Sequence, residues 1–390
     1  MLAHRQPMVS SVRRDAWVEV DLNAIERNIA EIRSWLNPGT RLMAVVKSDA
    51  YGHGAAGVAD MMIACGADWM GVASIDEGCQ LRAAGVSIPI LLLSPCPGWA
   101  ISTALEADLT LTVTSFAQLE DIAEACTRQN RVASFHLKID TGMHRLGIAP
   151  EKIDEVLTFI KANASLRLTG VLSHLARADE EDFSLYQKKI FDEALAKIKS
   201  QGHNPEIVHL ASGEAARRFK QTHYDMVRVG LYLYGLEARS VSDVVQPAMS
   251  VKGRINQIQI IDAKEAIGYN LTWTSEAPTR LASVPIGYAD GIDRRLSNKM
   301  SGLLMGKEVK QVGLISMDQM LFDISGVPEA QEGDVVTLIG SDTVDGQTHH
   351  LYLASWANML DTITYELACR LRARMPRMYT RNLPAQTKLK

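Results

Sequence analysis

The sequence predicts an α/β protein in which a (β/α)8 TIM barrel is followed by a mostly antiparallel β-domain. The chain has 390 residues, whereas a single core usually stops growing at roughly 250–300 residues, so two domains are expected. Short apolar runs alternate with helical segments over the first part, and the later part is rich in β-forming runs punctuated by Gly and Asp. We expect the barrel at residues 15–240 and the β-domain at residues 241–380.

Eight apolar, β-branched runs are typical of the strands of a parallel sheet, and the segments between them have helical periodicity. The runs lie at 41–47, 69–74, 89–94, 109–114, 134–140, 168–174, 207–212 and 226–230. Residues 115–130 and 181–202 are typical amphipathic helices, and the second ends at Gly202, which suits a C-cap. Eight successive βα units favour a closed barrel, although periodicity alone leaves an open doubly wound sheet possible.

The β-domain is expected from apolar runs at 250–261, 280–290, 309–325 and 334–340. The early run at about 16–22 precedes the first helix, and it is a candidate for an extra strand of the same domain.

Composition excludes several classes of protein. With 41 Lys and Arg against 45 Asp and Glu, the net charge is −4, and no long basic block suggests a nucleic-acid partner. The five cysteines are widely spaced without a CxxC pair, so we expect free thiols. His53 has no second His or Cys at the spacing of metal ligands, so we expect no metal site. We find no signal-peptide core and no membrane-spanning apolar run, so we expect a cytoplasmic protein.

Polar residues stand at the carboxyl ends of the predicted strands, where barrel active sites lie. They are Lys47, Lys138, Asp140, His174, Ser212 and Arg228. Strands seven and eight continue into Gly213 and Gly230, and loops at these positions of a barrel commonly bind phosphate. A lysine across the mouth from a phosphate site suggests a phosphorylated cofactor that carries an aldehyde, because a desolvated lysine can form a Schiff base with it.

The motifs "AVVKSDAYGHG", "HLKIDTGMHRLG", "VLSHLARAD", "MVRVGLYLYGL", "VPIGYADG" and "SMDQM" together resemble those of the alanine racemases, over roughly residues 15–380. These are pyridoxal-phosphate enzymes with a barrel and a β-domain. The resemblance implies that the chain interconverts L-alanine and D-alanine, which would supply D-alanine for peptidoglycan.

By resemblance, Lys47 holds pyridoxal 5'-phosphate and then serves one face of the substrate Cα–H, while Tyr288 serves the other. Because free tyrosine has a pKa of about 10, Tyr288 needs positive charge nearby, and by resemblance His174 lies beside both Tyr288 and Arg228. Arg228 would face the pyridine nitrogen, and a guanidinium that stays protonated would leave that nitrogen without a proton. A cofactor whose ring nitrogen is unprotonated withdraws electrons less strongly, which should limit transamination as a side reaction.

The remaining roles also come from the resemblance. Arg145 would bind the cofactor's phenolic oxygen and the substrate carboxylate, Met317 would offer its backbone N–H to that carboxylate, and Lys138 matches a position that is carbamylated in some members. The phosphate would be bound by Tyr51, Ser212, Gly213, Gly230, Leu231 and Tyr365. An anionic Glu214 beside a phosphate is unfavourable unless it points away. Tyr288 and Met317 would come from a partner subunit, which implies an obligate homodimer with composite sites.

Three other functions remain open on the same chain. A broad-spectrum or serine racemase shares the scaffold, but Tyr365 by resemblance narrows the pocket to a methyl group. A decarboxylase of this barrel class is expected to carry a Gly-Gly-Gly phosphate loop and a C-terminal Cys motif, which we do not find. A non-catalytic pyridoxal-phosphate carrier is a lone barrel, and the segment "VPIGYADG" argues against it.

Overall fold

In a computed structural model of the chain, residues 14–237, 239, 243–371 and 373–381 are described. The chain forms two compact units. The barrel unit contains Ile29–Ala50 and Val58–Leu233, and the sheet unit contains Met1–Asn28, Tyr51–Gly57 and Tyr234–Lys390. None of the helices among the described residues has a stretch long and apolar enough to cross a bilayer.

Eight parallel strands form the barrel unit, as the βα alternation predicts. They are β2 (Arg41–Val45), β3 (Trp69–Val72), β4 (Ile90–Leu92), β5 (Leu111–Val113), β6 (Ala133–Lys138), β7 (Leu166–Leu172), β8 (Ile207–His209) and β9 (Met226–Val229). Two ladders, β4-β3-β2-β9 and β5-β6-β7-β8, are joined by the parallel bridges Leu91↔Thr110 and Ser212↔Arg228. The joined ladders close the ring, which confirms a barrel and excludes the open sheet.

Side chains fill the interior of this barrel. Met43, Leu91, Ile207 and Met226, from four different strands, form a buried apolar cluster against which Trp69 packs. A filled interior is expected of an eight-stranded barrel, so ligands are bound by its loops and strand ends.

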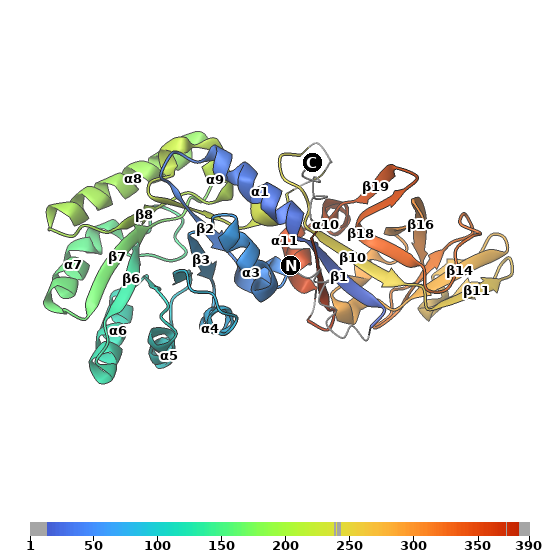
Figure 1. Ribbon diagram of the computed structural model, residues 1–390, viewed down its shortest axis with the longest axis horizontal. Helices are drawn as coiled ribbons and strands as arrows, with labels where there is room; N and C mark the ends of the chain where they lie inside the picture. Colours follow the sequence, from blue (N-terminus) through green and yellow to red (C-terminus); the bar gives the residue numbers. More distant parts are fainter. Residues whose placement is uncertain (1–13, 238, 240–242, 372, 382–390) are drawn as a thin grey trace, which may run out of the picture. The chain divides into compact units, whose positions relative to one another are not determined.

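Helices follow the strands of the barrel unit, and Figure 1 shows α6, α7 and α8 outside β6, β7 and β8. The helical segments are α1 (Leu22–Trp35), the left-handed turn α2 (Lys47–Tyr51), α3 (Ala55–Ala64), α4 (Ile75–Ala83), α5 (Ile101–Glu106), α6 (Phe116–Gln129), α7 (Ile153–Ala162), α8 (Glu181–Ser200) and α9 (Gly213–Arg218). Short 3-10 turns lie at η1 (Gly98–Ala100), η2 (Pro150–Lys152), η3 (Lys220–Thr222) and η4 (Leu231–Tyr234). Ser115 caps α6 by accepting from the N–H of Gln118 at 3.3 Å, as a serine before an apolar helical run predicts.

The sheet unit contains one large, mostly antiparallel sheet. Its strands run in the order β11-β14-β17-β16-β15-β18-β10-β1-β20, and β19 pairs with β18. The strands are β1 (Ala16–Asp21), β10 (Met249–Arg254), β11 (Gln257–Ile261), β14 (Thr279–Val284), β15 (Ser301–Leu304), β16 (Lys307–Val312), β17 (Met320–Asp323), β18 (Val335–Val344), β19 (Gln347–Leu351) and β20 (Arg377–Thr380). The early run therefore lies in this sheet, antiparallel to β10 and parallel to β20.

The remaining elements of the sheet unit are short. They are the ladder of β12 (Ala266–Ile267) with β13 (Trp273–Thr274), the helices α10 (Leu353–Leu360) and α11 (Thr364–Arg370), and the 3-10 turns η5 (Tyr269–Leu271), η6 (Tyr288–Asp290) and η7 (Arg294–Leu296). Among the described residues, none of the five cysteines forms a disulfide.

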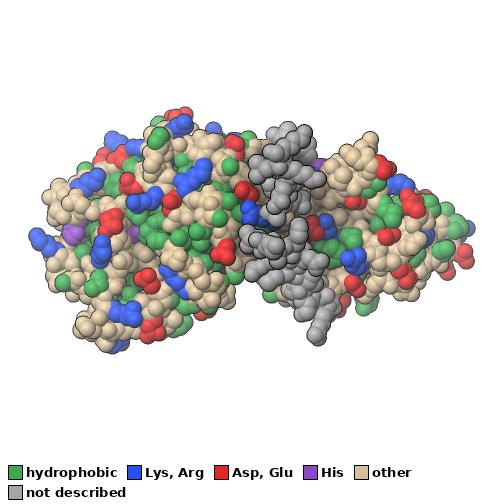
Figure 2. Space-filling view, in the orientation of Figure 1, with side chains coloured by type: hydrophobic (Ala, Val, Ile, Leu, Met, Phe, Trp, Pro, Cys, Tyr) green, Lys and Arg blue, Asp and Glu red, His purple; other side chains and the backbone are tan. Residues whose placement is uncertain are grey.

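Charges of both signs are interspersed over the face of the described residues drawn in Figure 2. This face therefore carries no extended basic stripe of the kind that tracks a nucleic-acid backbone.

Candidate functional site

The predicted residues of the barrel unit lie at the carboxyl ends of its strands. Lys47 comes two residues after β2, Lys138 ends β6, His174 comes two residues after β7, and Arg228 lies within β9. Ser212 follows β8 and bridges to Arg228. Because all eight strands are parallel and closed into a ring, their carboxyl ends meet at one mouth, where the predicted residues are brought together.

The chain takes a rare conformation immediately after Lys47. Ser48, Asp49, Ala50 and Tyr51 all have φ between +52° and +55°, a left-handed turn made without glycine. Left-handed residues cost roughly 1–2 kcal/mol each, and such strain concentrates at functional sites. Hydrogen bonds hold the turn: the N–H of Ser48 donates to Glu77 at 2.6 Å and that of Ala50 donates to the carbonyl of Val46 at 2.8 Å.

Arg228 is a buried guanidinium whose acceptors are all neutral. Its Nη1 donates to the Nδ1 and the carbonyl of His209 at 3.0 and 3.2 Å. Its Nη2 donates to the carbonyls of Ser173 and Leu210, at 2.8 and 3.0 Å, and lies 3.0 Å from the Nδ1 of His174. Burial lowers the pKa of Arg228 to about 10, so the side chain remains a cation at neutral pH. Its Nε–H has no acceptor among the described residues, and one donor is therefore available to a ligand.

The contacts of Arg228 fix the tautomers of three histidines. Because a guanidinium only donates, the Nδ1 atoms of His174 and His209 must accept, and each ring carries its proton on Nε2. The Nε2–H of His209 then donates to the Nδ1 of His136 at 2.8 Å, which leaves the proton of His136 on its own Nε2. Burial, followed by the charge of Arg228, lowers the pKa of both His136 and His174 to about 3.

His136 and His209 are not among the site residues that the sequence predicts. Both are fully buried in the barrel. A signal for the first was present, because His136 stands two residues before Lys138 in β6 and side chains of a strand alternate between its faces. The contact of His209 with Arg228 joins adjacent strands, and a pattern read within one strand does not show it.

Lys138 lies in a strongly positive environment. Only 6% of the residue is exposed. Burial lowers its pKa to about 8, with further lowering by the charges of Arg228, Arg145 and Lys47, against an opposing effect of Asp140. A substantial fraction of this amine is therefore neutral near physiological pH, and a neutral amine is the form that reacts with carbon dioxide.

Asp140 shapes the loop after β6. Its carboxylate accepts from the N–H groups of Gly142 and His144, each at 3.0 Å. Partial burial opposes ionisation, but these hydrogen bonds lower the pKa of Asp140 overall. The same loop carries Arg145, an exposed side chain whose charge acts on both Lys138 and His174.

The loops after β8 and β9 contain the predicted phosphate ligands. Ser212 is the N-cap residue of α9 but makes no side-chain cap bond, so its hydroxyl is not used by the helix. A Cβ on Gly213 would lie 2.8 Å from the ring of Tyr232, which explains the glycine. The carboxylate of Glu214 accepts from the Tyr232 hydroxyl and pairs with Arg218 at 3.4 Å, so its charge is compensated within the protein.

The other predicted residues lie in the sheet unit. Tyr51 packs its ring against that of Tyr234, with centroids 5.4 Å apart. Tyr365 is on α11, and partial burial followed by the charge of Glu237 raises its pKa. Tyr288 begins the turn η6 and is 40% exposed.

Met317 precedes β17 and is 53% exposed. Its carbonyl accepts from the N–H of Ala289 at 3.0 Å, while its own N–H has no acceptor among the described residues. Met317 and Tyr288 are therefore both exposed at the surface of the sheet unit, and the N–H of Met317 is available there to a ligand.

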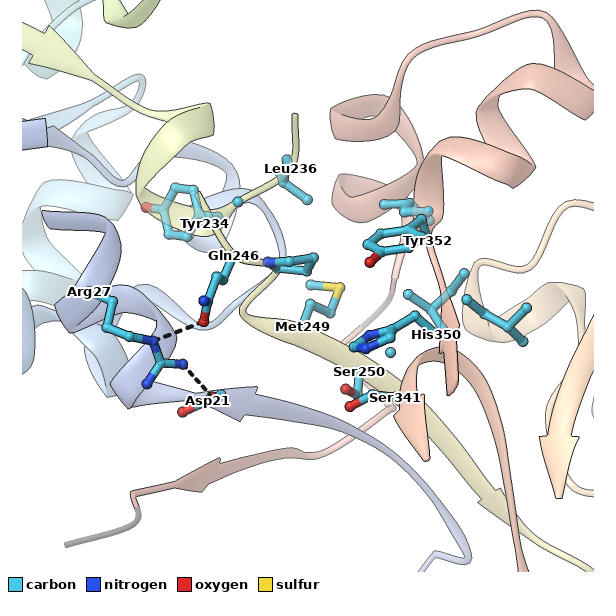
Figure 3. Close-up of a pocket in the computed structure, with 16 residues that line it drawn as sticks. Asp21, Arg27, Tyr234, Leu236, Gln246, Met249, Ser250, Ser341, His350 and Tyr352 are labelled. Carbon is cyan, nitrogen blue, oxygen red and sulfur yellow. Dashed lines mark hydrogen bonds and ion pairs between the residues drawn. The ribbon is translucent and has the colours of Figure 1, made fainter. Parts of the chain in front are cut away.

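A cavity of about 300 Å³ in the sheet unit is not the predicted site (Figure 3). Arg27 donates to Gln246 at 2.8 Å and to Asp21 at 3.4 Å on one side of it, and the stacked rings of His350 and Tyr352 lie on another. None of the predicted site residues lines this cavity. Among the described residues, no group of three His, Cys, Asp or Glu side chains is arranged to hold a metal ion.

Comparison with known proteins gives matches along nearly the whole chain. Residues 20–238 match the family described as alanine racemase, N-terminal domain, and residues 248–379 match its C-terminal domain. The alanine racemase of Synechocystis sp. is 39% identical over 376 residues, which cover 94% of this chain and 99% of that one.

Solved structures of the same family share the fold. The alanine racemase of Bacillus anthracis with bound L-Ala-P is 34% identical, with a TM-score of 0.87 and coverage of 95% of this chain and 96% of that chain. That of Bartonella henselae, with covalently bound pyridoxal phosphate, is 28% identical, with a TM-score of 0.81 and coverage of 94% and 99%.

Proposed function

The chain belongs to the alanine racemase family, and on that premise we propose that it interconverts L-alanine and D-alanine by moving the α-proton between two bases. Its product D-alanine would enter peptidoglycan. The observation that carries the proposal is Arg228, a buried cation that makes only neutral contacts and keeps one N–H available at the mouth of the barrel.

The residues of the barrel mouth fit pyridoxal 5'-phosphate. The Nε–H of Arg228 suits an unprotonated ring nitrogen, and Lys47 would bind the aldehyde. Arg145 would contact the phenolic oxygen. The phosphate would be held by Tyr51, Ser212, Gly213, Gly230, Leu231 and Tyr365. When bound, this cofactor withdraws electron density from the substrate α-carbon and so makes its proton easier to remove.

Two bases on opposite faces of the α-carbon account for inversion. Lys47 would remove or return the proton on one face, and Tyr288 would do so on the other. The Nε2–H of His174 is a donor because Arg228 occupies its Nδ1, so it can stabilise an ionised tyrosine. Arg145 and the N–H of Met317 would hold the substrate carboxylate.

The assembly that we propose is a homodimer in which Tyr288 and Met317 complete the site of the partner subunit. The supporting observation is that both residues are exposed in the sheet unit, at 40% and 53%. In this assignment, residues 15–240 provide most of the cofactor-binding residues, and residues 241–380 provide Tyr365 and the second base. The five cysteines form no disulfide among the described residues, which supports a location in the reducing cytoplasm.

The test is an absorbance spectrum of the purified protein, followed by incubation with L-alanine in deuterated water and chiral analysis. We expect an absorbance band near the visible edge that Lys47→Ala abolishes, together with D-alanine deuterated at the α-carbon. A band without any α-proton exchange would point to a cofactor carrier and contradict the proposal. Racemisation of serine at a rate equal to that of alanine would move the assignment to a broad-spectrum enzyme.

A further inference from the structure

A single arginine of the sheet unit links the turn that presents Tyr288 to the turn that presents Met317. The Nε of Arg374 donates to Asp290 at 2.7 Å, and its Nη2 donates to Asp318 at 2.5 Å. Asp290 closes the 3-10 turn that begins at Tyr288, and Asp318 directly follows Met317. The guanidinium therefore connects the two turns through two carboxylates.

Asp290 is an unusually well-bound carboxylate. Its side chain is fully buried, and it accepts from the backbone N–H of Gly287 at 2.9 Å as well as from Arg374. Arg14 donates to both of its oxygens, to the second at 2.8 Å. Although burial opposes ionisation, the hydrogen bonds from Arg14 and Arg374 lower its pKa overall. Asp290 thus remains a fixed anion at the centre of the cluster.

The backbones of the two turns also pack directly together. The N–H of Tyr288 donates to the carbonyl of Ser316, and that of Ala289 donates to the carbonyl of Met317, each at 3.0 Å. A Cβ on Gly287 would lie 2.2 Å from the Ser316 oxygen, so no larger residue fits there without a backbone shift. Tyr288 and Met317 are consequently held in fixed positions relative to each other. The side chain of Arg374 adds a second link between the same two turns.

We propose that Arg374 is a positioning residue for the Tyr288 half of the reaction. By joining Asp290 to Asp318, it fixes the Tyr288 hydroxyl relative to the Met317 N–H, so that proton transfer at the α-carbon and binding of the carboxylate stay aligned. The inference rests on the proposed racemase function. A catalytic base displaced by about 1 Å lowers the reaction rate roughly 100-fold. A contact that prevents such a displacement therefore has a measurable effect on the rate.

The test uses the full-length holoenzyme with Arg374→Gln and Asp318→Asn, because Asp290 is too buried to replace without risk to folding. The rates of α-proton exchange with retention and of inversion are measured for each alanine enantiomer in deuterated water. Tyr288→Phe identifies the enantiomer that Lys47 alone still exchanges. For that enantiomer, we expect Arg374→Gln to raise the ratio of exchange to inversion about 10-fold or more, because only the Tyr288 step is slowed.

Arg280→Gln is the matched control. Arg280 also holds turns of the sheet unit, through the carbonyls of Val327, Pro328 and Ala330, but it contacts neither turn of the Arg374 cluster. It should lower the melting temperature and leave the ratio unchanged, whereas Arg374→Lys, which keeps the charge, should restore part of the wild-type ratio. An unchanged ratio in Arg374→Gln, or an equal rise in Arg280→Gln, would overturn the inference. A wild-type enzyme that neither exchanges nor inverts alanine would instead refute the proposed function.

Discussion

The Nη2 of Arg228 lies 3.0 Å from the Nδ1 of His174, and this one contact fixes the protonation state of the histidine. A guanidinium cannot accept a hydrogen bond, so His174 must present an unprotonated Nδ1 and a protonated Nε2.

We therefore expect His174 to stay neutral across the physiological range. Burial and then the charge of Arg228 lower its pKa to about 3, so 15N spectra of the imidazole should show the Nε2–H tautomer unchanged from about pH 5 to 8. The unfolded chain takes up this proton near pH 6.5 but the folded chain does not, so the free energy of unfolding should fall as the pH drops from 6.5 towards 3. A midpoint near pH 6.5 for His174 would contradict the contact.

Arg228→Lys is expected to lower racemisation by about 100-fold, the usual cost of losing a preorganised donor. An ammonium group lacks the planar fork that reaches His209, Ser173 and Leu210 together, and each buried carbonyl left unpaired costs about 1–3 kcal/mol. Because the donor to the ring nitrogen is altered, the variant should also transaminate alanine. The pyruvate that this side reaction releases is detected with lactate dehydrogenase. Wild-type rates without pyruvate would contradict the role of Arg228.

Bicarbonate should activate the enzyme through Lys138. Its pKa of about 8 means that the neutral amine predominates above that pH, and only this form adds carbon dioxide. We expect a carbamate resonance in 13C-bicarbonate at alkaline pH that disappears in Lys138→Met. Since the resulting anion would orient Arg145, the KM for alanine should fall as the resonance grows. A KM for alanine that does not depend on bicarbonate would contradict a role for carbamylated Lys138.

Subunit mixing tests whether the sites are composite. Lys47→Ala and Tyr288→Phe should each be inactive as homodimers. After the two are dissociated and reassembled together, half of the dimers pair one of each, and each such dimer has one intact site, so about a quarter of the wild-type activity should return. If both bases belong to one subunit, no activity will return on mixing.

Tyr365→Ala should relax the preference for alanine. Removing a ring from the wall of a pocket sized for a methyl group is expected to raise the ratio of serine to alanine racemisation by about 10-fold or more. Tyr365→Phe is the control, because it removes the hydroxyl available to the phosphate while keeping the ring. If the ratio of serine to alanine racemisation changes equally in both variants, the change results from altered cofactor binding and not from a larger pocket.

The amino-acid sequence by itself determined the barrel, the β-sheet and most of the residues of the barrel mouth. The reason is local: strand and helix periods are properties of neighbouring residues, and in a closed parallel barrel every strand end points to the same face, so Lys47, Lys138, His174 and Arg228 could be placed without knowing any contact. The family motifs supplied the residues of the sheet unit, to which no such rule applies.

Only the tertiary structure decided how these groups are charged and held. His136 and His209 are 73 residues apart, and Arg374 lies 84 residues from Asp290 and 56 from Asp318. Such pairings depend on which strands and turns become neighbours, and the direction of each hydrogen bond then follows from the donor and acceptor that meet. The tautomer of His174, the low pKa of Lys138 and the link between the Tyr288 and Met317 turns are therefore properties of the folded chain that no local pattern encodes.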